Sequence, residues 1–184
     1  MKELSLNILD ITENSVKAGA TLTEIILKET DDMLIITVKD NGCGMSEDVV
    51  NSVTNPFYTT RTTRNVGLGI PLFKLAAEQT GGKIEIISKT KESDSAHHGT
   101  SVTAYFYKNH IDFTPLGDVI ATVTTLIFGH PETDFLFIHA KGEKEIRLDT
   151  RELRNILEDV PLNSYDVIDW IRGYLEEQYT SFDF

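Results

Sequence analysis

Three short segments rich in polar residues and glycine lie within the first 70 residues, and they constrain this chain more than its composition does. They contain Asp10 with Asn14, then Asp40 with Gly42 and Gly44, and then Gly67, Leu68 and Gly69. Each segment lies within or next to a stretch with a regular hydrophobic pattern, so a stable element is expected to hold it in place. A chain of 184 residues with this pattern is predicted to form one globular unit with a smaller attached part.

The hydrophobic pattern predicts an α+β fold. Apolar residues recur three and four positions apart over residues 4–17, which is typical of an amphipathic helix, and a second helix is predicted to begin near Gly69. Strands are predicted at residues 21–28, 33–38, 83–88 and 100–107. Together these elements predict a two-layer α/β sandwich, with helices on one face of a mixed sheet.

The chain is predicted to divide near residue 110. Residues 1–110 carry the three segments, whereas residues 111–184 form a smaller α+β extension without a motif of their own. In that extension the pattern predicts helices at 115–128, 150–157 and 164–178, with a hairpin of strands at 135–139 and 145–148.

Charge narrows the range of partners. The chain has 17 basic and 29 acidic residues, and 15 of the acidic residues lie in residues 111–184. A net charge of −12 argues against a nucleic acid or an anionic membrane surface as the main partner. The acidic extension is either an ordinary solvated surface or a docking surface for a partner protein.

The cysteine content and the hydropathy of the chain indicate in which cellular compartment it is expected. The single cysteine, Cys43, excludes an internal disulfide. No apolar run approaches the roughly 20 residues of a membrane-spanning helix. A cytoplasmic protein is therefore expected.

Asp10 and Asn14 are four positions apart and share one face of the first predicted helix. A carboxylate and an amide oxygen one turn apart can position a water molecule and supply a hard oxygen ligand to Mg²⁺. Taken alone, the pair is more typical of a solvated helix face.

Asp40 follows a predicted buried strand and precedes a turn that contains Gly42 and Gly44. A carboxylate there can accept a hydrogen bond from an adenine amino group, and the glycines allow the backbone to approach the base. An ordinary turn is the alternative interpretation.

The third segment places Gly67, Leu68 and Gly69 at the start of a predicted helix, after a loop that contains Arg61 and Arg64. The free amides of a helix start, its dipole and the two guanidinium groups form an anion site suited to a polyphosphate.

The order and spacing of these segments, followed by Gly81-Gly82-Lys83-Ile84 and Gly99-Thr100, resemble the nucleotide-binding boxes of an ATPase superfamily. This superfamily joins DNA gyrase B, the heat-shock chaperones, the histidine kinases and the MutL-type mismatch-repair proteins. Residues 13–21 look most like the MutL type, and residues 55–61 and 67–72 look more like the histidine kinases. The resemblance covers about 110 residues and implies the Bergerat-type ATP-binding fold.

The resemblance implies a role for each matching residue. Asn14 corresponds to the Mg²⁺ ligand, and Asp40 corresponds to the carboxylate that recognises adenine. Asp10 stands where hydrolysing members carry a glutamate that activates water, and it is one methylene shorter. The other positions implied in this way are Gly42, Gly44, Gly67, Gly69 and Thr100. Leu68, between the two phosphate-loop glycines, and Arg61 and Arg64, from the anion-site argument, complete the predicted nucleotide-binding set.

The leading functional hypothesis is a stand-alone signalling protein that binds ATP or ADP with Mg²⁺. Like the catalytic domain of a histidine kinase, it would act on a partner protein by phosphoryl transfer or by nucleotide-dependent binding. No histidine of the chain stands on a helix suited to act as the phosphoacceptor, so the partner is expected to supply the acceptor. The alternatives are a hydrolytic ATPase switch of the MutL or gyrase type and a non-catalytic nucleotide-sensing module. Whether the chain is an enzyme and whether it forms a homodimer are left open.

Overall fold

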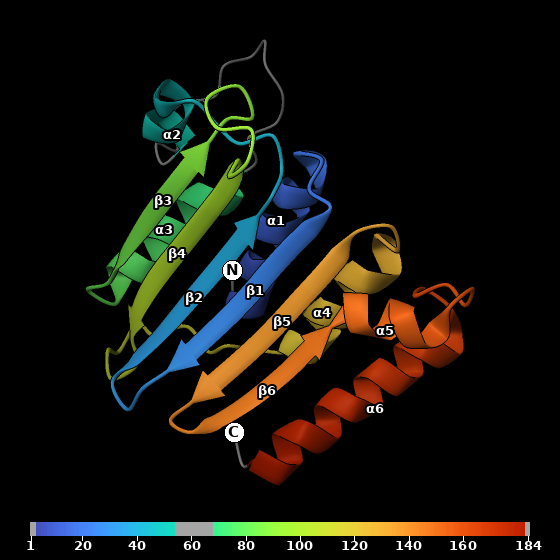
Figure 1. The fold of residues 1–184 in the computed structure, drawn as a ribbon. Helices are drawn as coiled ribbons and strands as arrows, with labels where there is room; N and C mark the ends of the chain where they lie inside the picture. The colour runs from blue at the N-terminus through green and yellow to red at the C-terminus, as the bar shows by residue number, and fades with distance from the viewer. Residues whose placement is uncertain (1–2, 54–67, 183–184) are drawn as a thin grey trace.

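The computed structural model describes residues 3–53 and 68–182 of the chain. In chain order its elements are α1 (Leu4–Lys17), β1 (Leu22–Glu29), β2 (Met33–Asp40), α2 (Glu47–Val53), α3 (Gly69–Gln79), β3 (Lys83–Lys89), β4 (Gly99–Tyr107), α4 (Val119–Gly129), β5 (Asp134–Lys141), β6 (Lys144–Asp149), α5 (Thr150–Leu157) and α6 (Tyr165–Phe182). Figure 1 shows how they are arranged in space.

One mixed sheet organises the described residues. Its six strands lie in the order β3-β4-β2-β1-β5-β6. β1 pairs with β5 in parallel, and every other neighbouring pair is antiparallel. This arrangement confirms the predicted α+β fold with a mixed sheet.

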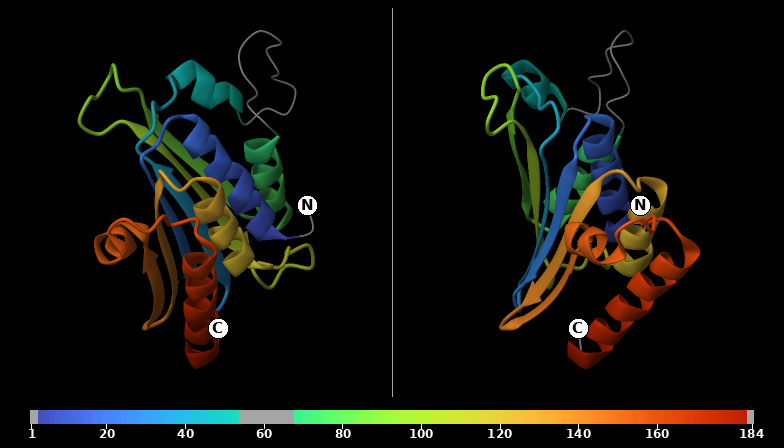
Figure 2. Two further views of the ribbon diagram at one scale, coloured as in Figure 1. Left: turned by 90° about the vertical axis from the view of Figure 1, so that its right-hand side faces the viewer. Right: turned by 45° about the vertical axis from the view of Figure 1, so that its right-hand side comes forward.

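Side chains alternate across the sheet, as the period of two predicts. In β1 and β2, Ile25, Leu27, Leu34 and Ile36 are buried on the same face, whereas their neighbours along each strand are more exposed. Helices α1, α3 and α4 cover this buried face, and α6 runs beside the edge strand β6 (Figure 2). No helix in the described part of the chain combines the length and apolar character that a membrane crossing requires.

Residues beyond 110 extend the same sheet. β5 pairs with β1 over its whole length, from Leu22 opposite Asp134 to Glu29 opposite Lys141. α4 lies beside α1 in the helical layer (Figure 2). The predicted boundary near residue 110 therefore lies in the connection from β4 to α4, and both parts contribute to one hydrophobic core.

The helix predicted at 115–128 begins instead at Val119, for two reasons. The carbonyl oxygens of Pro115 and Leu116 accept hydrogen bonds from the first backbone N–H groups of α1, at 2.9 and 2.8 Å. Asp118 then caps α4, because its Oδ1 accepts from the N–H of Ala121 at 2.8 Å. Pro115 and Leu116 thus provide hydrogen-bond acceptors for the start of α1 and are not part of α4.

Candidate functional site

Asp40 is the centre of a hydrogen-bond network at the end of β2. Its Oδ1 accepts from the N–H groups of Gly42 at 2.8 Å and Thr100 at 3.2 Å, and its Oδ2 accepts from the Ser15 hydroxyl at 2.7 Å. The residue is only 9% exposed. An ionised carboxylate has about four acceptor positions, so the described residues leave one position on Oδ2 for a further donor. Asp40 is thus held in one orientation and can still accept a hydrogen bond from a ligand.

The turn after Asp40 is packed against the protein on two sides. A Cβ at Gly42 would lie 3.0 Å from the Ala18 side chain, and a Cβ at Gly44 would lie 1.9 Å from the Lys89 carbonyl oxygen. Gly44 also has a φ of +71°, which disfavours any side chain. Packing within the protein therefore already requires Gly44, independently of any contact with a base, whereas at Gly42 a side chain would be crowded by Ala18.

The end of β3 and the start of β4 lie on the other side of Asp40. The Ser88 hydroxyl lies 2.8 Å from the Thr100 hydroxyl, and it accepts from the N–H of Met45 at 2.7 Å. Gly99 has a φ of +127°, and a Cβ there would lie 2.0 Å from the Asp40 carbonyl oxygen. These contacts join β3, β4 and the turn after β2 into one wall of the site.

Asp10 and Asn14 lie on the outer face of α1, against the start of α3. A Cβ at Gly69 would lie 3.2 Å from the Asp10 Cβ and 3.7 Å from the Asn14 Nδ2. No described side chain caps α3. Pro71 has no N–H, so Gly69 and Ile70 supply the donors of the first turn. The electropositive start of a helix, a carboxylate and an amide therefore lie together.

The structure brings most of the residues predicted from the sequence to one end of the molecule. Asn14 and Ser15 are consecutive, and the hydroxyl of Ser15 contacts Asp40, so the two predicted clusters share one wall. Leu68 is exposed beside Gly69, at the position before α3. The described members of the predicted set are Asp10, Asn14, Asp40, Gly42, Gly44, Leu68, Gly69 and Thr100. The predictions for Arg61, Arg64 and Gly67 lie outside the described residues.

Sequence reasoning did not identify three residues of this network: Ser15, Ser88 and His98. Ser15 faces inward from α1, and its partner Asp40 is 25 positions away. The ring of His98 contacts the carbonyl oxygen of Gly42, which is 56 positions away. The position of Ser15 directly after Asn14 was the one local signal for its role.

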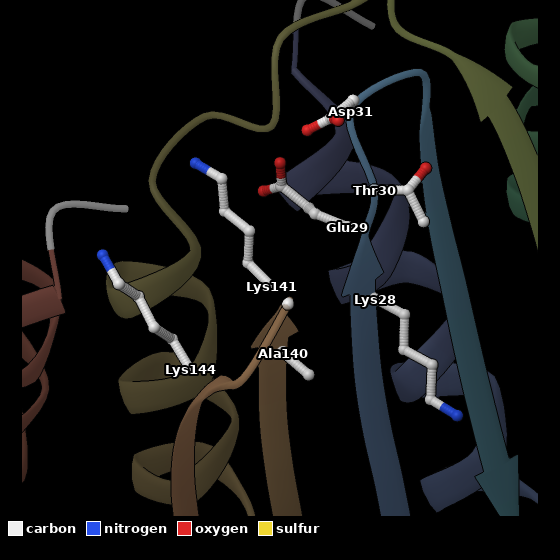
Figure 3. A pocket seen from close by; sticks show the side chains of 8 residues that line it. Lys28, Glu29, Thr30, Asp31, Ala140, Lys141 and Lys144 are labelled. Carbon is white, nitrogen blue, oxygen red and sulfur yellow. The ribbon is translucent and has the colours of Figure 1, made fainter.

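A separate pocket of about 610 Å³ lies at the opposite end of β1 (Figure 3). Figure 3 shows Glu29 and Asp31 on the β1 side of this pocket and Lys141 and Lys144 on the side of β5 and β6. None of the residues predicted from the sequence lines it. The candidate site is therefore at the other end of the sheet.

Glu29, which lines that pocket, also belongs to a partly buried polar cluster. His139 donates a hydrogen bond to it at 2.9 Å, and the Lys108 ammonium lies 2.9 Å from its other oxygen. The bond from His139, with Lys108 nearby, lowers the pKa of Glu29 to about 2. The Nδ1 of His139 lies 2.8 Å from the Tyr179 hydroxyl. Burial raises the pKa of Tyr179 well above its usual value. The cluster ties α6 to the end of β1.

Comparison with known proteins identifies a family of ATPases and several similar proteins. Residues 2–110 match the family described as histidine kinase-, DNA gyrase B- and HSP90-like ATPase. Sensor histidine kinase YvrG of Bacillus subtilis is 34% identical over 101 residues, which cover 52% of this chain and 16% of that protein. The chain spans 10 to 20% of the length of the curated relatives it matches.

Two solved structures share the fold. The N-terminal domain of a DNA repair protein has a TM-score of 0.60 and 17% identity, over 81% of this chain and 53% of that chain. The MutL ATPase domain of Aquifex aeolicus, complexed with ADP, has a TM-score of 0.54 and 15% identity, over 86% of this chain and 70% of that chain. With the match over residues 2–110, the chain belongs to the histidine kinase-, DNA gyrase B- and HSP90-like ATPase family.

Proposed function

We propose that this protein binds ATP and ADP together with Mg²⁺ and acts in signalling on a partner protein. The observation that supports this most directly is the Asp40 network. Three protein donors fix the carboxylate and leave one acceptor position on Oδ2. Adenine presents an exocyclic amino group to such an acceptor, whereas guanine has a carbonyl oxygen at the corresponding position. The site is therefore expected to prefer adenine.

The remaining residues fit the other parts of a nucleotide. The start of α3 offers the N–H groups of Gly69 and Ile70 and a favourable dipole to a phosphate. Asn14, next to that helix start, would supply an oxygen ligand to the cation. Bound ATP would supply the phosphoryl group, and Mg²⁺ would offset the charge of the phosphates. Asp10 is exposed on the same face and is available to hold a proton from a water molecule or an acceptor hydroxyl.

A partner that supplies the acceptor fits the positions of the five histidines of the chain. The ring of His98 contacts Gly42, His130 contacts Glu13, and His139 is buried against Glu29. His97 and His110 lie in connections between elements, beside Asp94 and Asp112. The exposed acidic residues of 111–184 offer a docking surface for the partner. A hydrolytic switch that dimerises and a non-catalytic sensor remain the alternative activities.

Nucleotide binding is tested by calorimetry with ADP, ATP and GDP in the presence of Mg²⁺. The Asp40→Asn variant is expected to lose about 1.5–3 kcal/mol of ADP binding free energy, the range for hydrogen bonds to charged groups. Asp48→Asn, on the exposed face of α2, is the matched control and should bind as the native protein does. Equal affinity for GDP and ADP, or full ADP affinity in Asp40→Asn, would contradict the proposal.

The activity is tested with ATP labelled on the γ-phosphate. The protein is captured from native lysate with and without ATP, and the bound fraction is incubated with the label. Label transferred to a captured protein supports the proposed role. Release of inorganic phosphate without labelled protein supports the hydrolytic alternative, and binding without either reaction supports the sensor.

A further inference from the structure

His98 contacts the turn that follows Asp40. It lies at the end of the connection from β3 to β4, and its Nδ1 is 2.6 Å from the carbonyl oxygen of Gly42. A carbonyl oxygen can only accept a hydrogen bond, so the Nδ1 of His98 must carry the proton. The neutral ring is therefore the Nδ1–H tautomer, with Nε2 unprotonated.

This contact closes a ring of hydrogen bonds around the turn. The N–H of Gly42 donates to the Oδ1 of Asp40 at 2.8 Å, and the N–H of Thr100 donates to the same oxygen at 3.2 Å. His98 completes the ring from the carbonyl side of Gly42. Both polar groups of the Gly42 backbone are thus engaged. The turn is held between Asp40 and the chain that leads into β4.

The connection that carries His98 is itself ordered. The Oδ1 of Asp94 accepts from the N–H groups of Ala96 at 3.2 Å and His97 at 3.0 Å, and its Oδ2 accepts from the Lys89 ammonium at 3.1 Å. These donors, with Lys89 the strongest, lower the pKa of Asp94 to about 2. A second bond, from the N–H of Lys91 to the Cys43 carbonyl oxygen at 3.2 Å, joins the connection to the same turn.

We propose that His98 is a positioning residue for nucleotide binding: by donating to the Gly42 carbonyl oxygen, it holds the turn of residues 41–44 and the Asp40 carboxylate in the arrangement that accepts the base. The inference rests on the proposed nucleotide binding. His98 acts through Gly42 and Asp40, so the donor at the position of Nδ1 is the feature that matters. The charge and shape of the ring are secondary.

Two amide substitutions separate the donor from the ring. The side-chain nitrogen of asparagine can occupy the position of Nδ1, whereas that of glutamine occupies the position of Nε2. His98→Asn should keep the bond to Gly42, and His98→Gln and His98→Ala should lose it. His97→Ala is the matched control, because the His97 side chain is 82% exposed and points to Asp94.

Calorimetric titration with Mg-ADP is the first measurement. We expect His98→Ala and His98→Gln to weaken binding by about three- to tenfold, which corresponds to one neutral hydrogen bond. His98→Asn should stay within about twofold of the native protein, and His97→Ala should not change. Circular dichroism of each variant checks that the fold is retained. Native affinity in a folded His98→Ala, or equal losses in His98→Asn and His98→Gln, would overturn the inference.

A second measurement does not need a nucleotide. In the ligand-free protein labelled with ¹⁵N-histidine, long-range ¹H–¹⁵N correlation spectra should show the Nδ1–H tautomer for His98 at neutral pH. The Nε2–H tautomer would overturn the inference directly. A native protein that shows the Nδ1–H tautomer but binds no ADP would overturn the proposed nucleotide binding, and with it the positioning role. Nucleotide binding that is unaffected in His98→Ala overturns the positioning role alone.

Discussion

The Oε1 of Glu13, on α1, lies 2.7 Å from the Nε2 of His130, which follows α4. Both side chains are partly exposed, so the pair contributes no more than about 1 kcal/mol to stability. The pair matters because it helps to fix the position of α1. Pro115 and Leu116 accept from the first N–H groups of α1, and His130 contacts the same helix near its other end. Residues beyond 110 therefore fix the helix that carries Asp10 and Asn14.

A chain that ends at residue 112 is expected to be unable to fold stably. It would lose the parallel pairing of β1 with β5, the acceptors for the start of α1, and the buried side chains of Phe135 and Phe137. Thermal unfolding followed by circular dichroism should show no cooperative transition, and size-exclusion chromatography should show aggregates. A monomeric fragment with a cooperative transition would contradict this expectation.

The elements with a strong local pattern could be predicted from the sequence, and their partners could not. The apolar spacing of α1 and the alternation in β1 and β2 were sufficient to place these elements. The parallel pairing of β1 with β5 joins segments more than 100 residues apart and has no local signal. For the same reason, the sequence did not show that residues beyond 110 share the sheet of residues 1–110.

In the candidate site, too, local motifs could be predicted from the sequence, and contacts between distant segments could not. Asp40 and its two glycines form a local motif that, taken alone, also fits an ordinary turn, and it became a predicted site only through its order and spacing with the other segments. The contacts from Ser15 and His98 depend on how α1 and the connection from β3 to β4 pack against that motif. The sequence explained Gly42 and Gly44 by the approach of a ligand, whereas the structure shows that the Lys89 carbonyl oxygen already requires Gly44 and that Ala18 crowds position 42. The roles of Arg61, Arg64 and Gly67 stay predictions.

The Gly44→Ala variant is expected to be strongly destabilised and to lose nucleotide binding. The left-handed backbone costs about 1–2 kcal/mol for a residue with a Cβ, and the new Cβ would also overlap the Lys89 carbonyl oxygen, 1.9 Å away. Gly142→Ala is the matched control. It has a φ of +63° and no atom within 4 Å of the new Cβ. Its free energy of unfolding should therefore fall by only about 1–2 kcal/mol. Urea unfolding of both variants measures the difference.

Stability should fall in acid through Glu29. The bond from His139, with Lys108 nearby, lowers its pKa from 4.5 to about 2 in the folded protein. The folded state thus binds this proton less readily than the unfolded state. The stability that ionised Glu29 contributes to the folded protein is therefore fully present above about pH 4.5. It is lost as the pH falls from there toward 2.

Urea unfolding at several pH values checks this expectation. Glu29→Gln should be less stable than the native protein at neutral pH, and the gap should narrow between pH 4.5 and 2. Glu143→Gln, in the exposed turn between β5 and β6, should follow the native profile. A gap between Glu29→Gln and the native protein that stays constant with pH would show that Glu29 does not titrate in this way.

Asp10 and Asn14 share one face of α1, and their roles are expected to separate by measurement. Asn14→Ala removes the proposed oxygen ligand of Mg²⁺, so it should weaken Mg-nucleotide binding and abolish any phosphoryl transfer. Asp10 should contribute more to rate than to affinity, because its proposed work is on a proton in the transition state. Asp10→Asn should therefore keep nucleotide affinity within about tenfold, or roughly 1.4 kcal/mol.

Lengthening the side chain of Asp10 tests its role by a gain of hydrolysis rather than a loss. Asp10→Glu should raise basal hydrolysis if the missing methylene is what separates the carboxylate from the attacking water. Gly69 lies against the Asp10 Cβ, so the longer chain must extend outward from α3, where the face is exposed. Turnover and calorimetry on the three variants decide between the roles. If Asp10→Asn loses binding as completely as Asn14→Ala, then Asp10 holds the nucleotide or the fold, and a role as general base is excluded.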